Sequence, residues 1–288
     1  AVGNIYENNL FMANYFDFLG IAPRMRVPDA PKKLPAVMAG GIEFRGVGFR
    51  YPEREEWVLR GVDLTIRPGE KIAFVGHNGA GKTTLIKLLA RLYDPTEGAI
   101  FLDGIDVRDV DPHELRQKIG VIFQDFVRYH LPARENIGFG QIEAADQMEK
   151  IVEAARKSGA HAMIEDLPEG YQTMLGRWFA RGHELSLGQW QRTALARAFM
   201  RDAEILVLDE PTASVDAQTE YEIFRHFQEL TAGKMAILIS HRFSTVRMAD
   251  RIVVIENGRI AETGSHHELL RREGTYARLF SMQAEGYR

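Results

Sequence analysis

The chain contains 288 residues, 26% of them charged and 45% hydrophobic, which is close to the composition of soluble globular proteins. This composition excludes a wholly disordered chain, and the length excludes a small scaffold that depends on disulfides. Lys and Arg number 36 against 40 Asp and Glu, a net charge of −4, so no overall positive field draws the protein to nucleic acid and no nucleic-acid partner is expected. The absence of cysteine excludes disulfides, thiolate metal sites and thiol nucleophiles, and it suits a reducing compartment.

The N-terminal segment has the pattern of a helix followed by a linker. Residues 4–19 place apolar side chains on two helical stripes, so this predicted helix needs partners on more than one side. Four of the 11 prolines fall within residues 23–35, which predicts a semi-extended linker. The segment is not a signal peptide, because it carries Glu7 and Asp17 and has no basic residue among its first twenty. The chain opens with Ala-Val in place of Met, which suggests a piece of a longer protein.

From Gly41 onward, short apolar runs alternate with helical patterns. The predicted buried strands cover residues 71–75, 120–123, 205–208, 235–239 and 252–255, and the predicted helices cover residues 82–92, 112–118, 146–158, 187–201 and 217–230. Alternation of this kind indicates a mostly parallel α/β sheet. No window of about 18 apolar residues occurs, so the sequence itself predicts no membrane span.

The residues after the strand that ends at Val75 match G-x-x-x-x-G-K-[ST], the pattern of a phosphate-binding loop. A polyphosphate requires closely spaced backbone N–H donors at the positive end of a helix, and three glycines let the main chain wrap that closely. Lys82 is expected to reach the β- and γ-phosphates, and Thr83 to ligate Mg²⁺. A Gly-rich turn without a ligand is the alternative, against which the flanking strand and helix argue. The predicted nucleotide-binding residues here are Gly76, His77, Asn78, Gly79, Ala80, Gly81, Lys82, Thr83 and Thr84.

Two carboxylates, Asp209 and Glu210, directly follow the predicted strand at residues 205–208. The carboxyl ends of parallel strands meet at the sheet edge where ligands bind, so we expect this pair beside the phosphate loop. Asp209 suits the Mg²⁺ shell, and Glu210 can orient and polarise an attacking water as a general base. A solvated turn would be the simpler explanation if the pair stood alone.

The stretch Leu185–Gln189 reads Leu-Ser-Leu-Gly-Gln and precedes a predicted helix. Ser186 can cap this helix and Gln189 can close a capping box, which by itself is a sufficient structural role for both residues. The same hydroxyl and free N–H groups also make an anion site. Here the sequence resembles the ATP-binding cassette (ABC) family, whose signature Leu-Ser-Gly-Gly-Gln is matched at four of five positions. The resemblance runs from about Ile42 to Leu279, with the family motifs in order.

The resemblance implies roles for four further residues. Tyr51 would stack on adenine, and Gln124 would link Mg²⁺ and the water to the membrane-domain contact. Asp216 would lie in the D-loop that crosses a dimer, and His241 would contact the γ-phosphate. Taken singly, Tyr51 could be a half-buried strand residue, Gln124 a strand end and His241 a capped loop residue. The expected catalytic residues are therefore Glu210, His241 and Gln124, the expected Mg²⁺ ligands are Thr83, Gln124 and Asp209, and the signature residues expected to act on a second chain are Ser186, Leu187, Gly188 and Gln189.

The same resemblance implies the fold and the partners. It implies an α/β fold of the P-loop (RecA-like) type with a mostly parallel sheet core, an antiparallel β subdomain and an inserted α-helical signature subdomain. The expected partners are a second ATPase domain, in a homodimer formed with ATP, and a transmembrane domain of the same polypeptide, which would place this part at the cytoplasmic face of a membrane. The expected divisions are residues 1–20 as the end of the last transmembrane helix, 21–40 as the linker and 41–288 as the ATPase domain, with the helical subdomain at about 126–200.

Two positions depart from the family pattern. Leu187 stands where the first signature Gly is usual, which removes backbone freedom near the phosphate. Exporters commonly carry T-x-V-G-E-x-G before the signature, whereas residues 176–182 keep only the final Gly, so Ala180 cannot make the acidic contact.

Within the family, an exporter ATPase domain is the leading interpretation, because Arg134–Gly140 resembles the exporter stretch E-N-I-x-x-G. A detached importer subunit would start close to the first strand, and a soluble ABC protein would carry two cassettes or a coiled-coil insertion. A nucleotide sensor without hydrolysis would lack Glu210 or His241, and both are present. A GTPase would carry N-K-x-D, which this sequence lacks.

Overall fold

The structure is a computed structural model. It describes residues 2–21, 25–123, 125–179, 181–201, 203–209, 227, 231–240 and 243–285. The predicted helix at 217–230, apart from Phe227, lies outside the described residues. So do Gln124, Ala180, Glu210, Asp216 and His241, and the roles expected of them stay predictions.

The larger sheet has six strands in the order β10-β9-β3-β8-β7-β6. The five strands from β9 to β6 run parallel, and β10 pairs antiparallel at one edge. Their central residues are apolar and buried, because a parallel sheet is covered on both faces. This confirms the predicted mostly parallel sheet. The bounds are β3 Lys71–Val75, β6 Ile119–Ile122, β7 Ile205–Asp209, β8 Met235–Ile239, β9 Arg251–Glu256 and β10 Arg259–Gly264.

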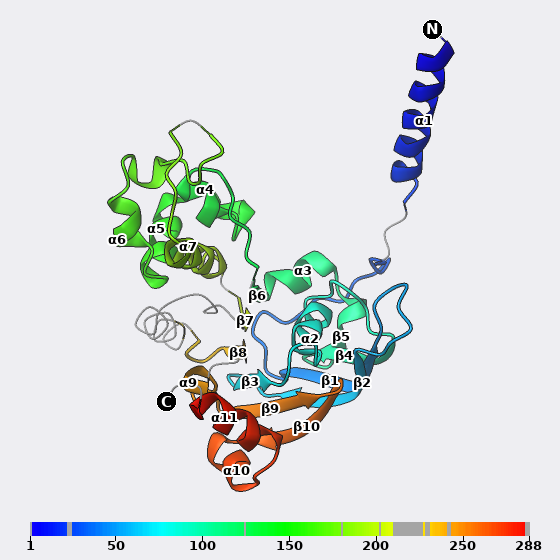
Figure 1. Cartoon of the computed structure of the whole chain (residues 1–288), viewed down its shortest axis with the longest axis vertical. Coiled ribbons are helices and arrows are strands. Elements are labelled where there is room, and N and C mark those ends of the chain that lie inside the picture. The colour runs from blue at the N-terminus through cyan, green and yellow to red at the C-terminus, as the bar shows by residue number, and fades with distance from the viewer. Residues whose placement is uncertain are drawn as a thin grey trace.

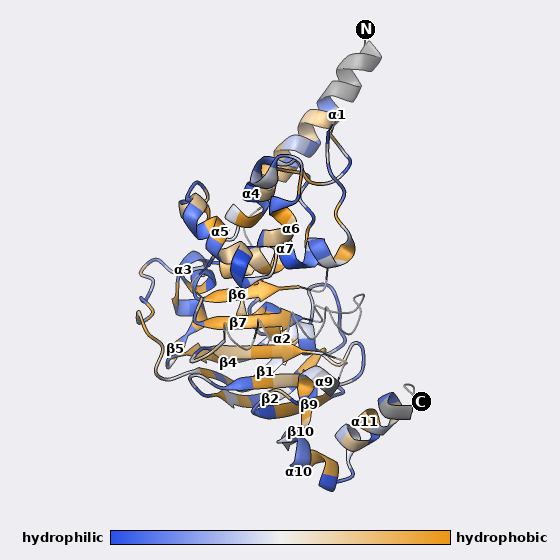
Figure 2. Ribbon diagram, turned by 90° about the vertical axis from the view of Figure 1, so that its left-hand side faces the viewer, coloured by the Kyte–Doolittle hydropathy of each residue, from blue (hydrophilic) through white to orange (hydrophobic). Residues whose placement is uncertain are grey.

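A second, antiparallel sheet has the order β2-β1-β4-β5. Its apolar side chains join those of the larger sheet and of helix α2 in one core cluster. Figure 2 shows the hydrophobic strands of both sheets gathered below the helices α4–α7. The elements of this part are β1 Ile42–Phe49, β2 Leu59–Ile66, α2 Lys82–Leu89, β4 Glu97–Leu102, β5 Ile105–Asp106, the 3₁₀ helix Val107–Asp109 and α3 Pro112–Gln117.

Helices α4–α7 form a separate lobe, set to one side of the sheets in Figure 1. The lobe has its own core around the buried Trp190, and α7 contacts the edge strand β6. The bounds are α4 Ala133–Gly138, α5 Met148–Lys157, α6 His161–Glu165 and α7 Leu187–Phe199, with short 3₁₀ helices at Ile142–Ala144 and Gly170–Gln172.

The N-terminal helix α1, Val2–Leu19, projects away from the rest of the chain in both views (Figures 1 and 2). No helix in the described part of the chain is long and apolar enough to cross a bilayer. The described linker residues, 25–40, form no helix and are fixed to the domain surface. Asp103 accepts hydrogen bonds from the backbone N–H groups of residues 39–41, and Leu34 and Met38 are buried in the core.

Three C-terminal helices that the sequence analysis did not predict complete the fold. They are α9 Phe243–Val246, α10 His266–Arg271 and α11 Thr275–Glu285. Leu269 and Tyr276 are fully buried and join these helices to the face of the large sheet opposite α2.

Candidate nucleotide-binding site

The predicted phosphate loop connects the end of β3 to the start of α2. Gly76 and Gly81 both have positive φ angles, of 153° and 106°, and neither has room for a side chain. A Cβ on Gly76 would lie 2.2 Å from the carbonyl oxygen of Ile255, and one on Gly81 would lie 2.6 Å from a methyl group of Leu59. The glycines are therefore required by the close approach of β9 and β2 to the loop.

The side chain of Lys82 lies inside this loop. It is 5% exposed, and its Nζ donates to the carbonyl oxygens of Gly76 at 2.8 Å and His77 at 3.0 Å. The ammonium group is thus held at the centre of the loop, next to the helix N-terminus, where an anion is favoured. The loop's outer residues, His77 and Asn78, are exposed.

Helix α2 supplies the two threonines after the lysine. Gly81 occupies the N-cap position, and in the described structure no side chain caps the helix with a hydrogen bond. Thr83 is half-buried, and Thr84 is buried. The Thr84 hydroxyl lies 3.1 Å from the hydroxyl of Tyr51. The structure therefore brings Tyr51 to α2, the helix that follows the phosphate loop.

Asp209 is the last residue of β7, and it is 3% exposed. Only β8 separates β7 from β3, and all three strands are parallel, so Asp209 and the phosphate loop share the carboxyl edge of the sheet. This is the placement that the sequence predicted. Asp209 is the last described residue before the gap that contains Glu210.

The signature lies elsewhere in the chain. Ser186 is the N-cap of α7, Gln189 N–H donates to its Oγ at 3.3 Å, and Ser186 N–H donates to Gln189 Oε1 at 2.8 Å. The predicted capping box is confirmed. Ser186 is exposed, and Leu187 and Gly188 are half-buried. Figure 1 shows α7 in the helical lobe, apart from α2, so the signature and the phosphate loop of one chain do not form a single site.

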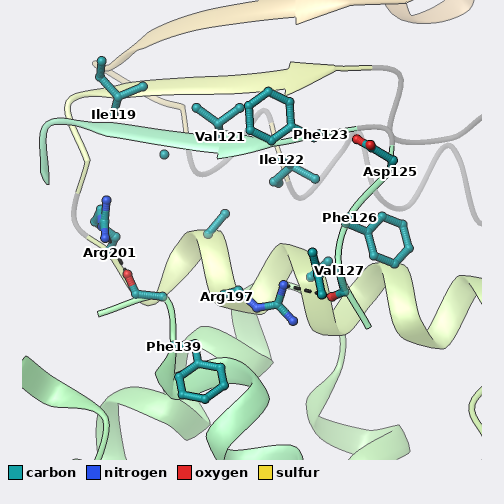
Figure 3. A pocket seen from close by; sticks show the side chains of 14 residues that line it. Ile119, Val121, Ile122, Phe123, Asp125, Phe126, Val127, Phe139, Arg197 and Arg201 are labelled. Carbon is teal, nitrogen blue, oxygen red and sulfur yellow. Dashed lines mark hydrogen bonds between the residues drawn. The ribbon is translucent and has the colours of Figure 1, made fainter. Parts of the chain in front are cut away.

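A cleft of about 430 Å³ lies between β6 and α7, at the base of the helical lobe. Figure 3 shows Ile122 of β6 pointing toward α7, the helix that carries Arg197, whereas Val121 and Phe123 lie on the other side of the strand; Phe139 and Val127 are at the margins. Val127 is 54% exposed, so apolar surface is open to solvent here. Phe123 and Asp125, the residues before and after Gln124 in the sequence, both line the cleft.

Sequence reasoning missed Arg197, which organises this region. Its Nη1 donates to the Val127 carbonyl at 3.1 Å, and its Nε donates to the Asn136 carbonyl at 2.9 Å. Burial lowers the pKa of the Arg197 guanidinium, and the carbonyl acceptors compensate for the lost hydration. The sequence could not predict this role, because the acceptors of Arg197 are backbone carbonyls in segments distant from α7 in the sequence.

Comparisons with known proteins agree with this geometry. The family model described as "ABC transporter" matches residues 59–213. The chain is 42% identical over 268 residues to an ATP-dependent lipid A-core flippase of Syntrophus aciditrophicus (strain SB), with 93% of this chain and 43% of the relative covered. It is also 42% identical to the mitochondrial potassium channel ATP-binding subunit of Pongo abelii, with 94% and 38% covered.

Among solved structures, a bacterial Atm1-family ABC exporter with ATP bound matches with a TM-score of 0.87 and 36% identity. The match covers 97% of this chain and 48% of that one. The chain thus spans less than half the length of these relatives. The flippase and the potassium channel subunit are equally similar to this chain, at 42% sequence identity, so sequence identity alone does not indicate a transported substrate.

Proposed function

The chain belongs to the ABC transporter family, and from that premise we propose that it binds ATP together with Mg²⁺ and hydrolyses the ATP to drive export across a membrane. ATP binding and ATPase activity are properties of this family of domains. Export, dimer formation and the membrane partner are proposed as well, and each involves a second chain or a further domain.

The observation that carries the proposal is the shared sheet edge. Lys82 is held inside the phosphate loop at the end of β3, and Asp209 ends β7 at the same edge. A cation and a buried carboxylate at the same edge of the sheet suit a polyphosphate with its metal ion between them. Gly76 and Gly81 pack closely against β9 and β2, whereas a Cβ on Gly79 would meet no described atom within 4 Å.

The donor set fits Mg²⁺. Thr83 offers a hydroxyl, Asp209 a carboxylate and Gln124 an amide oxygen, which are the hard oxygen ligands that Mg²⁺ prefers. Bound Mg²⁺ would neutralise charge that develops on the phosphates. Lys82 would hold the β- and γ-phosphates, and Glu210 would orient and deprotonate the attacking water. His241 is proposed to contact the γ-phosphate.

The proposed active unit is a dimer with ATP between the chains. Ser186 is exposed at the N-terminus of α7. Figure 1 shows the helical lobe that holds α7 apart from α2, so the signature is available to a second molecule. The hydroxyl and N–H groups of that helix start would stabilise charge on the transferring phosphoryl group. Hydrolysis should then rise more than linearly with protein concentration, and light scattering of the Glu210→Gln variant with ATP should show a dimer. A monomer at high concentration with ATP would contradict this part of the proposal.

The proposed membrane partner is a transmembrane domain of the same polypeptide, which places this domain at the cytoplasmic face of a membrane. Two features support it. At the apolar cleft between β6 and α7, the exposed side chains of Phe139 and Val127 are available to an incoming segment. Helix α1 carries an exposed aromatic surface, including Phe11 at 72% and Phe18 at 69% exposure.

The central experiment separates binding from chemistry. Glu210→Gln should keep ATP binding and lose about 10²–10⁴-fold in turnover, as expected for removal of a general base. Lys82→Ala should weaken both binding and turnover, because the loop loses its only buried ammonium among the described residues. Steady-state hydrolysis near the unmodified rate by the Glu210→Gln protein would remove Glu210 from its proposed role.

A further inference from the structure

The side chain of Tyr51 is held by two aromatic neighbours and by a hydroxyl contact. Tyr51 follows strand β1, which ends at Phe49, in the segment that leads to β2. Phe49 and Tyr93 pack against it with ring centroids 4.9 and 5.3 Å away and interplanar angles of 80° and 88°. These perpendicular contacts restrict the tilt of the ring, as edge-to-face pairs do.

The third contact comes from the phosphate-binding helix. The Thr84 hydroxyl is 3.1 Å from the Tyr51 hydroxyl, and Thr84 is only 6% exposed. A hydroxyl this deeply buried is costly without a partner, so the two hydroxyls satisfy each other. Lys87, one turn further along α2, places its Nζ 5.8 Å from the centre of the Tyr51 ring.

We propose that Thr84 is a positioning residue, whose side-chain hydroxyl fixes the Tyr51 ring relative to the phosphate loop so that the adenine base meets a preformed stacking surface. This inference rests on the proposed function, in which Tyr51 stacks on the base. The hydrogen bond ties the base contact and the phosphate contact to the same helix. ATP then binds without first ordering the tyrosine side chain, whose immobilisation would otherwise weaken binding.

The test is a double-mutant cycle read by ATP affinity. Thr84→Val keeps the shape and removes the hydroxyl, and Tyr51→Phe keeps the ring and removes the other hydroxyl. Each should raise the Kd for ATP about 3- to 10-fold, the amount expected when one side chain must be ordered on binding. The double variant should be no weaker than either single variant, because both changes remove the same bond. Thr84→Ser should restore the affinity.

A ligand without a base separates positioning from phosphate binding. Inorganic tripolyphosphate should bind the Tyr51→Phe protein as tightly as it binds the unmodified chain, because Tyr51 is assigned to the base contact and not to the phosphate loop. Thr231→Val is the matched control, because it also removes a buried hydroxyl. This hydroxyl donates a 2.9 Å hydrogen bond to the Phe227 carbonyl, outside the phosphate loop. The control variant should leave both affinities unchanged.

The outcomes distinguish this inference from the proposed function. Additive effects in the cycle, or a loss of tripolyphosphate binding in Tyr51→Phe equal to its loss of ATP binding, would overturn the positioning role while leaving the ATPase proposal intact. Tyr51→Ala should weaken ATP binding by about tenfold or more through lost stacking. Unchanged ATP affinity in Tyr51→Ala would overturn both the positioning role and the base contact. Failure of the unmodified chain to bind ATP would refute the proposed function itself.

Discussion

The guanidinium of Arg197 donates a 3.1 Å hydrogen bond to the carbonyl oxygen of Val127, and this bond joins helix α7 to the segment that follows β6 (Figure 3). Arg197 also donates to the carbonyl and the side-chain oxygen of Asn136 at 2.9 and 3.3 Å. Asn136 in turn donates to the carbonyls of Tyr129 and Leu131. The helix that begins at the signature is therefore fixed to the segment that follows β6 and to α4.

Replacing Arg197 by Met should destabilise this junction. The substitution keeps much of the apolar stem but removes the donors to Val127 and Asn136. Unpaired carbonyls in a partly buried site should cost about 1–3 kcal/mol of unfolding free energy. Urea unfolding measures the change, with Arg128→Met as the control. Arg128 is exposed on the same segment, so its substitution should stay within about 0.5 kcal/mol. Equal effects of the two variants would contradict the structural role of Arg197.

The glycines of the phosphate loop should respond unequally to Ala. Gly76→Ala would place a Cβ 2.2 Å from the Ile255 carbonyl, so either β9 or the loop must move. We expect a loss of about 3 kcal/mol or more, typical of severe overpacking. In Gly79→Ala the Cβ meets no described atom within 4 Å, and only the φ of +80° is unfavourable, at about 1 kcal/mol. Thermal unfolding of the two variants measures the difference, and a larger loss in Gly79→Ala would contradict this packing.

The phosphate loop and the strands beside it could be predicted from the sequence, because each depends on a local pattern. Continuous apolar runs identified β3 and β7, and the glycine spacing identified the loop between β3 and α2. Strand β10 was missed because its residues are mostly polar and partly exposed, so only pairing with β9 makes it a strand. Helix α6 has five residues, too few for a helical period to be visible. The contact between Tyr51 and Thr84 joins distant segments, and no local pattern encodes it.

The histidine at the start of α10 should make stability depend on acid pH. His266 Nδ1 lies 2.7 Å from the Tyr276 hydroxyl. Burial, and then the charges of Arg247 and His267, lower the pKa of His266 below its usual 6.5. The unfolded chain therefore binds this proton more readily, so the stabilising contribution is present above about pH 6.5 and is lost as the pH falls below it.

Denaturant unfolding at pH 5 and pH 7.5 tests this dependence. His266→Asn offers an amide oxygen to the Tyr276 hydroxyl and does not titrate, so the stability of this variant should fall less between the two pH values. His183→Asn is the matched control, because His183 is exposed and lies outside α10 and α11. An unchanged pH dependence in His266→Asn would remove His266 from this role.

The N-terminal helix should behave independently of the ATPase fold. Its exposed apolar side chains include Phe11, Phe16, Phe18 and Leu19, each more than half exposed, and α1 stands clear of the sheets in Figures 1 and 2. A helix with this much uncovered apolar surface is unstable alone in water and favours association. Deleting residues 1–20 should leave ATP affinity nearly unchanged, since the linker is anchored separately through Asp103, and it should raise solubility.

Hydrogen exchange of the full chain should show α1 amides exchanging far faster than those of β7. Protection of α1 equal to that of β7 in a monomer would mean that the helix belongs to the ATPase fold, and the proposed contact with a membrane domain would then lose its physical basis.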